Sequence, residues 1–250
     1  MWLCVIAGVL CASLLAGAQE LEVNGHRLFL NCEGASPGPT VILIAGAGGS
    51  TATWDKIQPQ ISKFAKVCSY DRAGLGRSDP VSSTQPQSAT QIVNDLSVLL
   101  RVGHVKSPYV LVGHSIGGIY ARMFDEQYDS EVAGMILLDS SHEEQIWRFA
   151  RSEPDALQEY PQWSNQSAMS AQGFLPPGEH LRWQFKKPLI VIEHGIPPEP
   201  VWHEMQKDLA SRSPMGQLIT ATRSRHYIQN SQPELVVEEV RSVVAQALYR

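Results

Sequence analysis

The sequence lacks the spacings that mark most metal sites. Its 250 residues include four cysteines and eight histidines, and none of these form a Cys-x-x-Cys or His-x-x-x-His pair. Short loops and helices usually hold zinc through pairs of this kind. We therefore expect no metal site, and no motif in the sequence calls for a cofactor.

Basic residues are too few and too scattered for a nucleic-acid-binding protein. Lys and Arg number 20 against 25 Asp and Glu, which gives a formal net charge of -5. Nucleic-acid binding normally requires a basic patch or stripe, so we expect no nucleic-acid partner. The hydrophobic and charged shares, 43% and 18%, are ordinary for a globular protein, and the length suits one large domain.

Charged side chains are absent from the first eighteen residues. This apolar run ends in Ala16, Gly17 and Ala18, and polar Gln19 follows. Small residues at such an ending are typical of a signal-peptide cleavage site. A membrane anchor is the alternative, because about 18 apolar residues can just span a bilayer. The ending favours a signal peptide over residues 1–18, so we expect a secreted or periplasmic chain without stable membrane insertion once the signal is removed.

Cysteine is scarce in the remaining chain. Removal of the signal takes Cys4 and Cys11 with it and leaves Cys32 and Cys68. An even number of cysteines in an exported protein favours a disulfide, and two buried free thiols are the alternative.

Short β-type runs alternate with helical patterns over residues 19–250, which predicts an α/β domain with a mostly parallel sheet and helices on both faces. Asn24 and Gly25 form a strong hairpin-turn signal between the first two runs. The other runs are continuously apolar, as in strands buried on both faces. The expected strands are Leu21–Val23, Arg27–Cys32, Val41–Ala45, Val67–Tyr70, Tyr109–Val112, Met135–Leu138, Leu189–Ile192 and Leu218–Thr222.

Apolar stripes with helical spacing fill the gaps between several of these strands. One lies within residues 92–100 and another within 116–124, and a last stripe runs from Pro233 to Leu248. Proline suits the first turn of a helix, so we expect the last helix to begin at Pro233.

The stretch from about 141 to 187 breaks the alternation. It is irregular and rich in Pro, Gln and Ser, and it is too long for an ordinary loop. Five large aromatic residues argue against disorder, and they are Trp147, Phe149, Trp163, Phe174 and Trp183. We interpret this stretch as a cap over an active site.

Residues 113–117 form the pentapeptide Gly-His-Ser-Ile-Gly. It follows an expected strand and opens an expected helix, which is the context that gives a Gly-x-Ser-x-Gly motif its meaning. The flanking glycines leave room for a tight turn that would expose the Ser115 hydroxyl and direct free helix N–H groups toward an anion. We predict that Ser115 is a nucleophile. The alternative is an ordinary turn with a buried serine.

A serine nucleophile needs a base, and His226 is the best-placed histidine. It follows the expected strand 218–222 and precedes the last helix, at the carboxyl edge of the sheet where Ser115 must also lie. Open α/β sheets bind ligands at that edge. His142 and His194 lie at strand ends on the same edge and remain rivals.

Three stretches resemble the motifs of capped α/β-hydrolases of the esterase and lipase type. They are residues 44–49 with Trp54, residues 70–78, and residues 112–118. The resemblance covers residues 20–250 and implies an eight-stranded α/β-hydrolase fold with a cap insertion after strand 6. It also implies an oxyanion hole made by the backbone N–H groups of Ala47 and Ile116.

Three further expectations depend on this resemblance. The second strand should run antiparallel beside the fourth, which places Cys32 opposite Cys68 and predicts a disulfide between them. Many family members carry the catalytic acid after the seventh strand, where this chain has Glu193 and Glu199. Others carry it after the sixth, where Asp139 lies, and we predict Asp139. We expect a buried charge pair between Asp71 and Arg72 to brace the adjacent loops.

These observations predict a serine hydrolase that cleaves ester or related acyl bonds of small to medium apolar substrates, with a small-molecule ester as its partner. The oligomeric state is unknown. The expected substrate-binding aromatics are Trp54, Trp147, Trp163 and Trp183.

Three alternatives exist on the same fold. A serine aminopeptidase would present acidic residues to the substrate amine, as Glu143 and Glu144 would allow. A dehalogenase needs an aspartate nucleophile, and Ser115 opposes it. A ligand-binding protein without activity remains possible because fold does not fix function.

Overall fold

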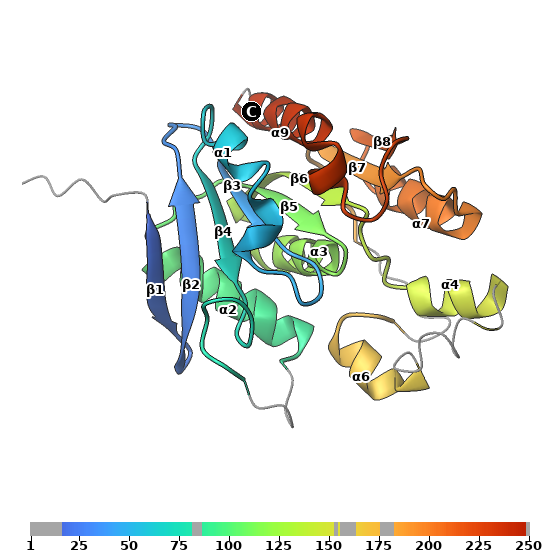
Figure 1. The fold of residues 1–250 in the computed structure, drawn as a ribbon, viewed down its shortest axis with the longest axis horizontal. Coiled ribbons are helices and arrows are strands. Elements are labelled where there is room, and N and C mark those ends of the chain that lie inside the picture. Colours follow the sequence, from blue (N-terminus) through green and yellow to red (C-terminus); the bar gives the residue numbers. More distant parts are fainter. Residues whose placement is uncertain (1–16, 82–86, 153–154, 156–163, 176–182, 249–250) are drawn as a thin grey trace, which may run out of the picture.

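One twisted sheet forms the centre of the protein in the computed structural model, which describes residues 17–81, 87–152, 155, 164–175 and 183–248 (Figure 1). Its eight strands lie in the order β1-β2-β4-β3-β5-β6-β7-β8. β2 pairs antiparallel with β1 and β4, and all other neighbouring pairs are parallel. The strands are β1 Ala18–Val23, β2 His26–Glu33, β3 Thr40–Ile44, β4 Val67–Asp71, β5 Tyr109–His114, β6 Val132–Leu138, β7 Leu189–His194 and β8 Gly216–Ala221. The fold class and all eight strands predicted from the sequence are confirmed.

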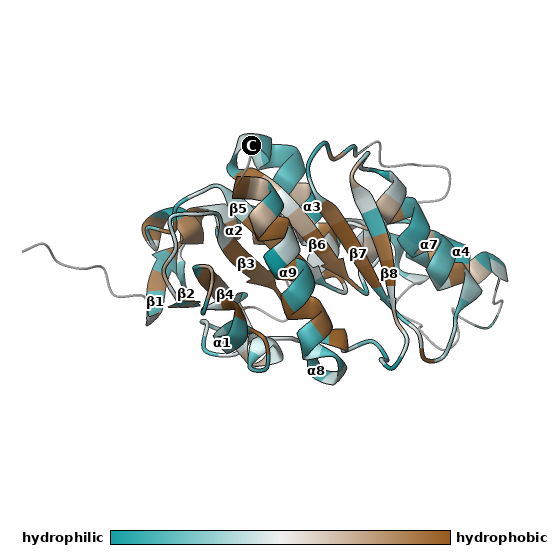
Figure 2. Ribbon diagram, turned by 90° about the horizontal axis from the view of Figure 1, so that it is seen from above, coloured by the Kyte–Doolittle hydropathy of each residue, from teal (hydrophilic) through white to brown (hydrophobic). Residues whose placement is uncertain are grey.

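Helices cover both faces of the sheet, and adjacent strand residues point to opposite faces. Leu111 of β5 packs in one cluster with residues of α2, α3 and α7. Val110 and Val112 pack in the other, with residues of α1, α8 and α9. Figure 2 shows the apolar strands between these more polar helices. The helices are α1 Gln58–Ile61, α2 Ala89–Val102, α3 Gly117–Tyr128, α4 Gln145–Ser152, α6 Gln166–Ala171, α7 Pro200–Ser211, α8 Ile228–Ser231 and α9 Pro233–Leu248, with short 3-10 turns η1 Thr51–Trp54 and η2 Asp129–Glu131.

Two local signals in the sequence act as expected. Asn24 and Gly25 both adopt positive φ, at 49° and 92°, which is the backbone that a two-residue hairpin turn of this type requires. The last helix, α9, begins at Pro233.

A disulfide joins Cys32 of β2 to Cys68 of β4. The two residues face each other in the antiparallel register, and their Cα atoms lie 4.1 Å apart. The predicted pairing is therefore confirmed. A native disulfide of this kind typically stabilises a fold by about 2–4 kcal/mol.

The segment between β6 and β7 contains α4 and α6, which lie together beside the main body of the sheet (Figure 1). Contacts with α3 and with the chain before α2 hold its described part to the rest of the protein. The Tyr120 hydroxyl of α3 donates to Oε1 of Gln172 at 3.1 Å, and Nε2 of Gln172 donates to the Gln87 carbonyl at 3.2 Å. At Gly173, an added Cβ would lie 2.6 Å from Ile119 of α3, so the backbone here packs directly on α3. Trp163 lies outside the described residues.

The first sixteen residues also lie outside the description, so the signal peptide stays a prediction. β1 begins at Ala18, where the predicted signal ends. Within the described ranges, no helix is long and apolar enough to cross a membrane.

Candidate active site

Ser115 occupies a tight turn between a strand and a helix. β5 ends at His114 and α3 begins at Gly117. Ser115 has a φ of 54°, a left-handed conformation that costs energy for a residue with a side chain. Neighbouring backbone holds it there, because its N–H donates to the Leu138 carbonyl and its carbonyl accepts from the Ser141 N–H, both at 3.0 Å.

The two glycines of the pentapeptide are required by space. A Cβ at Gly113 would lie 2.6 Å from the Cα of Gly118, and a Cβ at Gly117 would collide with the carbonyl oxygen of Ile44. The steric reason inferred from the sequence therefore applies here: any larger residue would push the turn apart.

Asp139 and His226 meet at the carboxyl edge of the sheet. Asp139 follows the last residue of β6, and its side chain is fully buried. His226 lies between β8 and α8, and its Nδ1–H donates to Oδ2 of Asp139 at 2.7 Å. The His226 side chain is 42% exposed, so the ring has one face on the carboxylate and another open to solvent. The contact expected from the sequence is present.

Three more donors converge on the same carboxylate. Oδ1 of Asp139 accepts from the indole N–H of Trp202 at 2.7 Å and from the backbone N–H of His194 at 3.0 Å. The ring Nδ1 of His194 lies 2.9 Å from both carboxylate oxygens. Burial alone would raise the pKa of Asp139, but the hydrogen bonds from His194 and His226 outweigh it and lower this pKa below its ordinary value. Asp139 therefore carries its negative charge at neutral pH.

His114 holds the backbone of the His226 loop. Its Nε2–H donates to the His226 carbonyl at 3.0 Å, and the two rings lie 4.6 Å apart. Burial first, and then the neighbouring His226, lower the pKa of His114 to about 4. His114 is consequently a neutral support for the loop.

The Ser115 hydroxyl makes no hydrogen bond to any residue that the structure describes. Nucleophile–base contacts are often long in enzymes without substrate, so a nucleophilic role for Ser115 does not require this bond here.

The backbone N–H groups of Ala47 and Ile116 make no hydrogen bond within the described part of the chain. Their neighbours Gly49 and Gly118 instead donate to carbonyl groups of their own turns. Free N–H groups at this place suit the stabilisation of an oxyanion.

Arg72 fixes the loop that carries Ala47. Its guanidinium donates to the carbonyl groups of Ala45 at 2.6 Å and Gly46 at 2.5 Å. The expected charge pair with Asp71 is wrong. Asp71 instead accepts from the backbone N–H groups of Thr51 and Arg77, and no ion pair joins it to Arg72 among the described residues. Both side chains are buried, and each braces a loop through hydrogen bonds with main-chain groups.

The structure places the four expected substrate-binding tryptophans differently. Trp54 is wholly buried in the cluster beneath α9, so its expected contact with substrate is wrong. Trp183 is also buried, stacks on Phe185 and donates to Asp125 at 2.9 Å, which gives it a structural role instead. Trp163 lies outside the described residues. Trp54 and Trp183 lie in the core because burial of their large apolar rings is favourable there.

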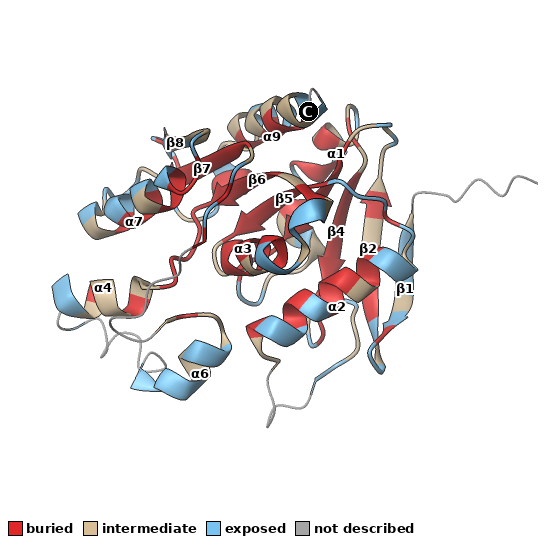
Figure 3. Ribbon diagram, turned by 180° about the vertical axis from the view of Figure 1, so that it is seen from behind, coloured by how far each residue is buried: buried red, intermediate tan, exposed pale blue. Residues whose placement is uncertain are grey.

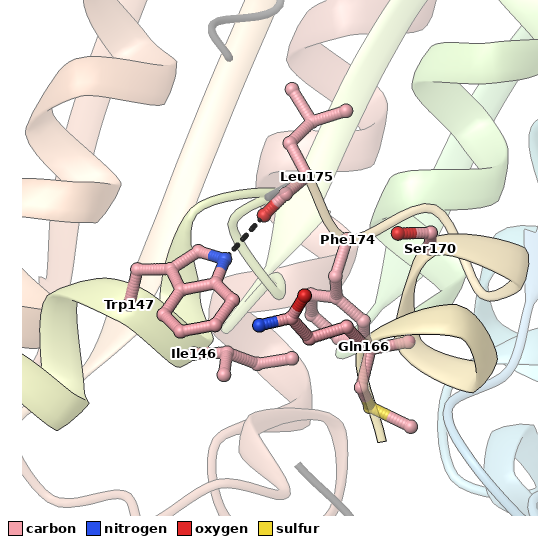
Figure 4. A pocket seen from close by; sticks show the side chains of 7 residues that line it. Ile146, Trp147, Gln166, Ser170, Phe174 and Leu175 are labelled. Atoms are coloured by element: carbon pink, nitrogen blue, oxygen red, sulfur yellow. Dashed lines mark hydrogen bonds between the residues drawn. The ribbon is translucent and has the colours of Figure 1, made fainter. Parts of the chain in front are cut away.

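Among the four expected tryptophans, Trp147 lines a pocket. The pocket lies between α4 and α6, encloses about 10 Å³, which is room for about one water molecule, and is lined by neither Ser115 nor His226. Figure 4 shows the Trp147 indole N–H donating to the Leu175 carbonyl, at 2.7 Å. The pocket is lined by Ile146, Trp147, Gln166, Met169, Ser170, Phe174 and Leu175.

The rival groups are engaged elsewhere. His142 is buried and bonds to Asp208 at 2.9 Å. Glu193 bonds to His203 and Thr220. Glu199 lies 3.8 Å from Nε2 of His194, and not against His226.

Two residues of the site were not identified in these roles from the sequence. His194 was weighed only as a rival base, and Trp202 was not singled out. Trp202 comes from α7, a helix that starts soon after β7. A tryptophan near a strand end is the available signal, but the sequence does not show which way its N–H points.

No group of three or more potential metal ligands occurs within the ranges that the structure covers.

The strand order, the crossover helices and the serine turn together define an α/β hydrolase architecture. A model of the family described as alpha/beta hydrolase fold matches residues 39–174, and the chain belongs to this family.

Relatives share the fold over different lengths. The chain is 27% identical to the uncharacterized protein YqjL of Bacillus subtilis, over 86% of this chain and 87% of that protein. It is 33% identical to the probable transporter efuK of Hormonema carpetanum, over 54% of this chain but only 20% of that much longer protein. Among solved structures, an esterase from Thermogutta terrifontis superposes with a TM-score of 0.69 at 18% identity, covering 93% of this chain and 99% of that one.

Proposed function

We propose that the protein is a serine hydrolase that cleaves carboxylic ester bonds of small to medium apolar substrates. The observation that carries the proposal is the 2.7 Å contact between Asp139 and His226 at the sheet edge that also holds Ser115. The three residues follow three different strands, β5, β6 and β8, at the same edge of the sheet. The esterase activity of the similar Thermogutta terrifontis protein is in line with this function.

In the proposed reaction, Ser115 Oγ attacks the acyl carbon while His226 Nε2 takes the hydroxyl proton. The N–H groups of Ala47 and Ile116 stabilise the oxyanion. Collapse of the intermediate transfers the proton from His226 to the leaving alcohol, and water then releases the acid from the acyl-enzyme by the same steps. Asp139 keeps the His226 ring oriented and stabilises its protonated form. No step needs a cofactor.

The proposed substrate class depends on the segment between β6 and β7 acting as a cap. The apolar side chains of this segment, among them Ile146, Trp147 and Phe174, favour an apolar acyl or alcohol group. The acidic residues that an aminopeptidase would use are already paired. Glu143 is buried against Arg122 and Arg212, and Glu144 pairs with Arg148 at 2.8 Å. Neither is free to bind a substrate amine.

Export from the cytoplasm is part of the same proposal. The disulfide between Cys32 and Cys68 requires an oxidising compartment, in line with the predicted signal peptide over residues 1–18.

The decisive experiment compares the native enzyme with Ser115→Ala. We expect a fluorophosphonate probe to label the native protein at Ser115 and to leave the variant unlabelled. Hydrolysis of p-nitrophenyl butyrate should fall by at least about 10³-fold, because the members of a triad act as a unit. Ser62→Ala, at the end of α1, is the matched control and should behave as native. A tenth of the native rate in Ser115→Ala would refute the assignment.

A further inference from the structure

Two histidine rings share one buried carboxylate. His226 donates to Oδ2 of Asp139 at 2.7 Å, and the ring Nδ1 of His194 lies 2.9 Å from both oxygens. His194 comes from the end of β7 and its side chain is nearly buried, whereas His226 comes from the far side of β8 and is half exposed. The proposed mechanism uses His226 and leaves His194 without a role.

A single negative charge cannot stabilise two protonated rings as well as it stabilises one. When His194 is neutral, the full charge of Asp139 is available to a proton on His226. When His194 is protonated, it neutralises Asp139 and repels a second positive charge. Groups that interact this strongly lose their protons as a coupled system and not as independent residues.

The surroundings favour a proton on His194. The hydrogen bond with Asp139 raises the pKa of His194, against the opposing effect of burial, and the charges of Asp139, Glu199 and Glu193 raise it further. Glu199 precedes α7 and lies 3.8 Å from the other ring nitrogen of His194, Nε2. His194 therefore keeps its proton to a higher pH than an ordinary histidine.

The remaining titratable neighbours are bonded to other groups or are neutral. Glu193 of β7 is bonded to His203 of α7 and Thr220 of β8. His114 of β5, which faces His226, is neutral near pH 7 because burial lowers its pKa to about 4. The other contact of Asp139, Trp202, does not titrate.

We propose that His194 is a positioning residue for this reaction: it shares the Asp139 carboxylate with His226 and so sets how strongly that carboxylate holds a proton on the base. The inference rests on the proposed serine-hydrolase function. The proposal involves only the gain and loss of ring protons by His194 and His226, whose charged forms compete for the same carboxylate. No bond other than N–H forms or breaks.

The first test is the pH profile of kcat/KM for His194→Asn. Asparagine keeps a neutral N–H donor for Asp139 but cannot carry a charge. We expect the acid limb to move toward higher pH by about half to one unit, with kcat on the plateau within about threefold of native and KM unchanged. His194→Ala removes the donor as well and should lower the plateau kcat by about tenfold. The plateau kcat of His194→Asn should be about tenfold higher than that of His194→Ala, because asparagine supplies the missing donor.

A matched control is His203→Asn. His203 also bonds to a buried carboxylate, Glu193, at 2.9 Å, but it does not touch Asp139. Its profile should coincide with native. An acid limb of His194→Asn that coincides with native would overturn the inference.

Direct titration of the ring resonances by NMR separates this inference from the proposed function. In His194→Asn the midpoint for His226 should move upward, and a midpoint within about 0.2 units of native would overturn the coupling. This readout needs no activity. Failure of the proposed function would appear differently, as a native protein that neither turns over esters nor takes a fluorophosphonate on Ser115.

The variant Glu199→Gln tests the same coupling with His194 intact, and it serves if the His194 variants fail to fold. Glu199 is on the surface, and its loss should lower the titration midpoint of His194. The His226 midpoint should then rise by a smaller amount than in His194→Asn. A shift in His194 without any response in His226 would contradict the coupling.

Discussion

Two buried carboxylates follow β6 within five residues of each other, and their partners differ in kind. Asp139 accepts hydrogen bonds from His194, Trp202 and His226. Glu143 lies 3.2 Å from the guanidinium of Arg122 and 2.5 Å from that of Arg212. Figure 3 shows the buried carboxyl ends of the central strands from which this segment emerges.

The partners of the two carboxylates differ in whether they gain and lose a proton near neutral pH. Histidine changes charge near neutral pH, and His226 is open to solvent on one side. Arginine keeps its charge, and both arginines at Glu143 are buried. Burial alone would raise the pKa of Glu143. The charges of Arg122, His142 and Arg212 outweigh burial and lower this pKa to about 2. Equally buried carboxylates thus have different roles: Asp139 supports a histidine that can exchange a proton, whereas Glu143 belongs to a structural ion cluster.

Asp139→Asn should give the largest effect. An amide cannot stabilise a protonated His226 and favours the wrong ring tautomer, so kcat should fall by about 10⁴-fold. Ester hydrolysis under saturating substrate measures it, with a urea titration to show that the fold is kept. Retention of most of the native kcat would place the catalytic acid elsewhere. Glu199→Gln should change kcat by less than about threefold.

Glu143→Gln should show the opposite division between activity and stability. It leaves two buried arginines short of a negative charge, so the free energy of unfolding should fall by about 3–5 kcal/mol. The kcat per folded molecule should stay within about threefold of native. Glu144→Gln, which removes only the partly exposed pair with Arg148, should cost no more than about 0.5 kcal/mol. Equal losses in the two variants would show that the buried cluster contributes no special stability.

The same cluster predicts how stability responds to acid. The pKa of Glu143 is depressed in the folded state to about 2, whereas an unfolded glutamate titrates near about 4.3. Its stabilising contribution is therefore complete above about pH 4.3 and is lost as the pH falls through about 2. The stability difference between native protein and Glu143→Gln should shrink by about 3 kcal/mol over that window. Urea titrations at a series of pH values measure it, and a constant difference would contradict the assignment.

Continuous apolar runs and helical stripes were sufficient to predict the strands, most of the helices and the α/β class, because such runs are stable only when they are buried. The position of His226 at the carboxyl edge also followed from the strand pattern. The resemblance to α/β-hydrolases was needed for Asp139 as the acid and for the antiparallel placement of the second strand beside the fourth, which predicted the pairing of Cys32 with Cys68.

The orientation of aromatic side chains was not within reach. Trp54, Trp183 and Trp202 all combine a large apolar ring with one N–H donor, so each fits a core, a pocket wall or a hydrogen bond to a carboxylate. Three-dimensional packing decides among these, and it placed Trp54 in the core and Trp202 on Asp139. The second ring on Asp139 escaped notice for a related reason: local sequence does not show that two histidines converge on one acid.

The origin of Asp139 on β6 has a practical consequence. Ser115 and Asp139 are fixed by adjacent rungs of the sheet, because Ser115 N–H bonds to Leu138 and Asp139 N–H bonds to Ile192. Neither depends on the segment that begins at α4. The helices α4 and α6 supply none of these bonds, so we expect their exchange for the corresponding helices of related hydrolases to change substrate selectivity while Ser115 and Asp139 keep their positions.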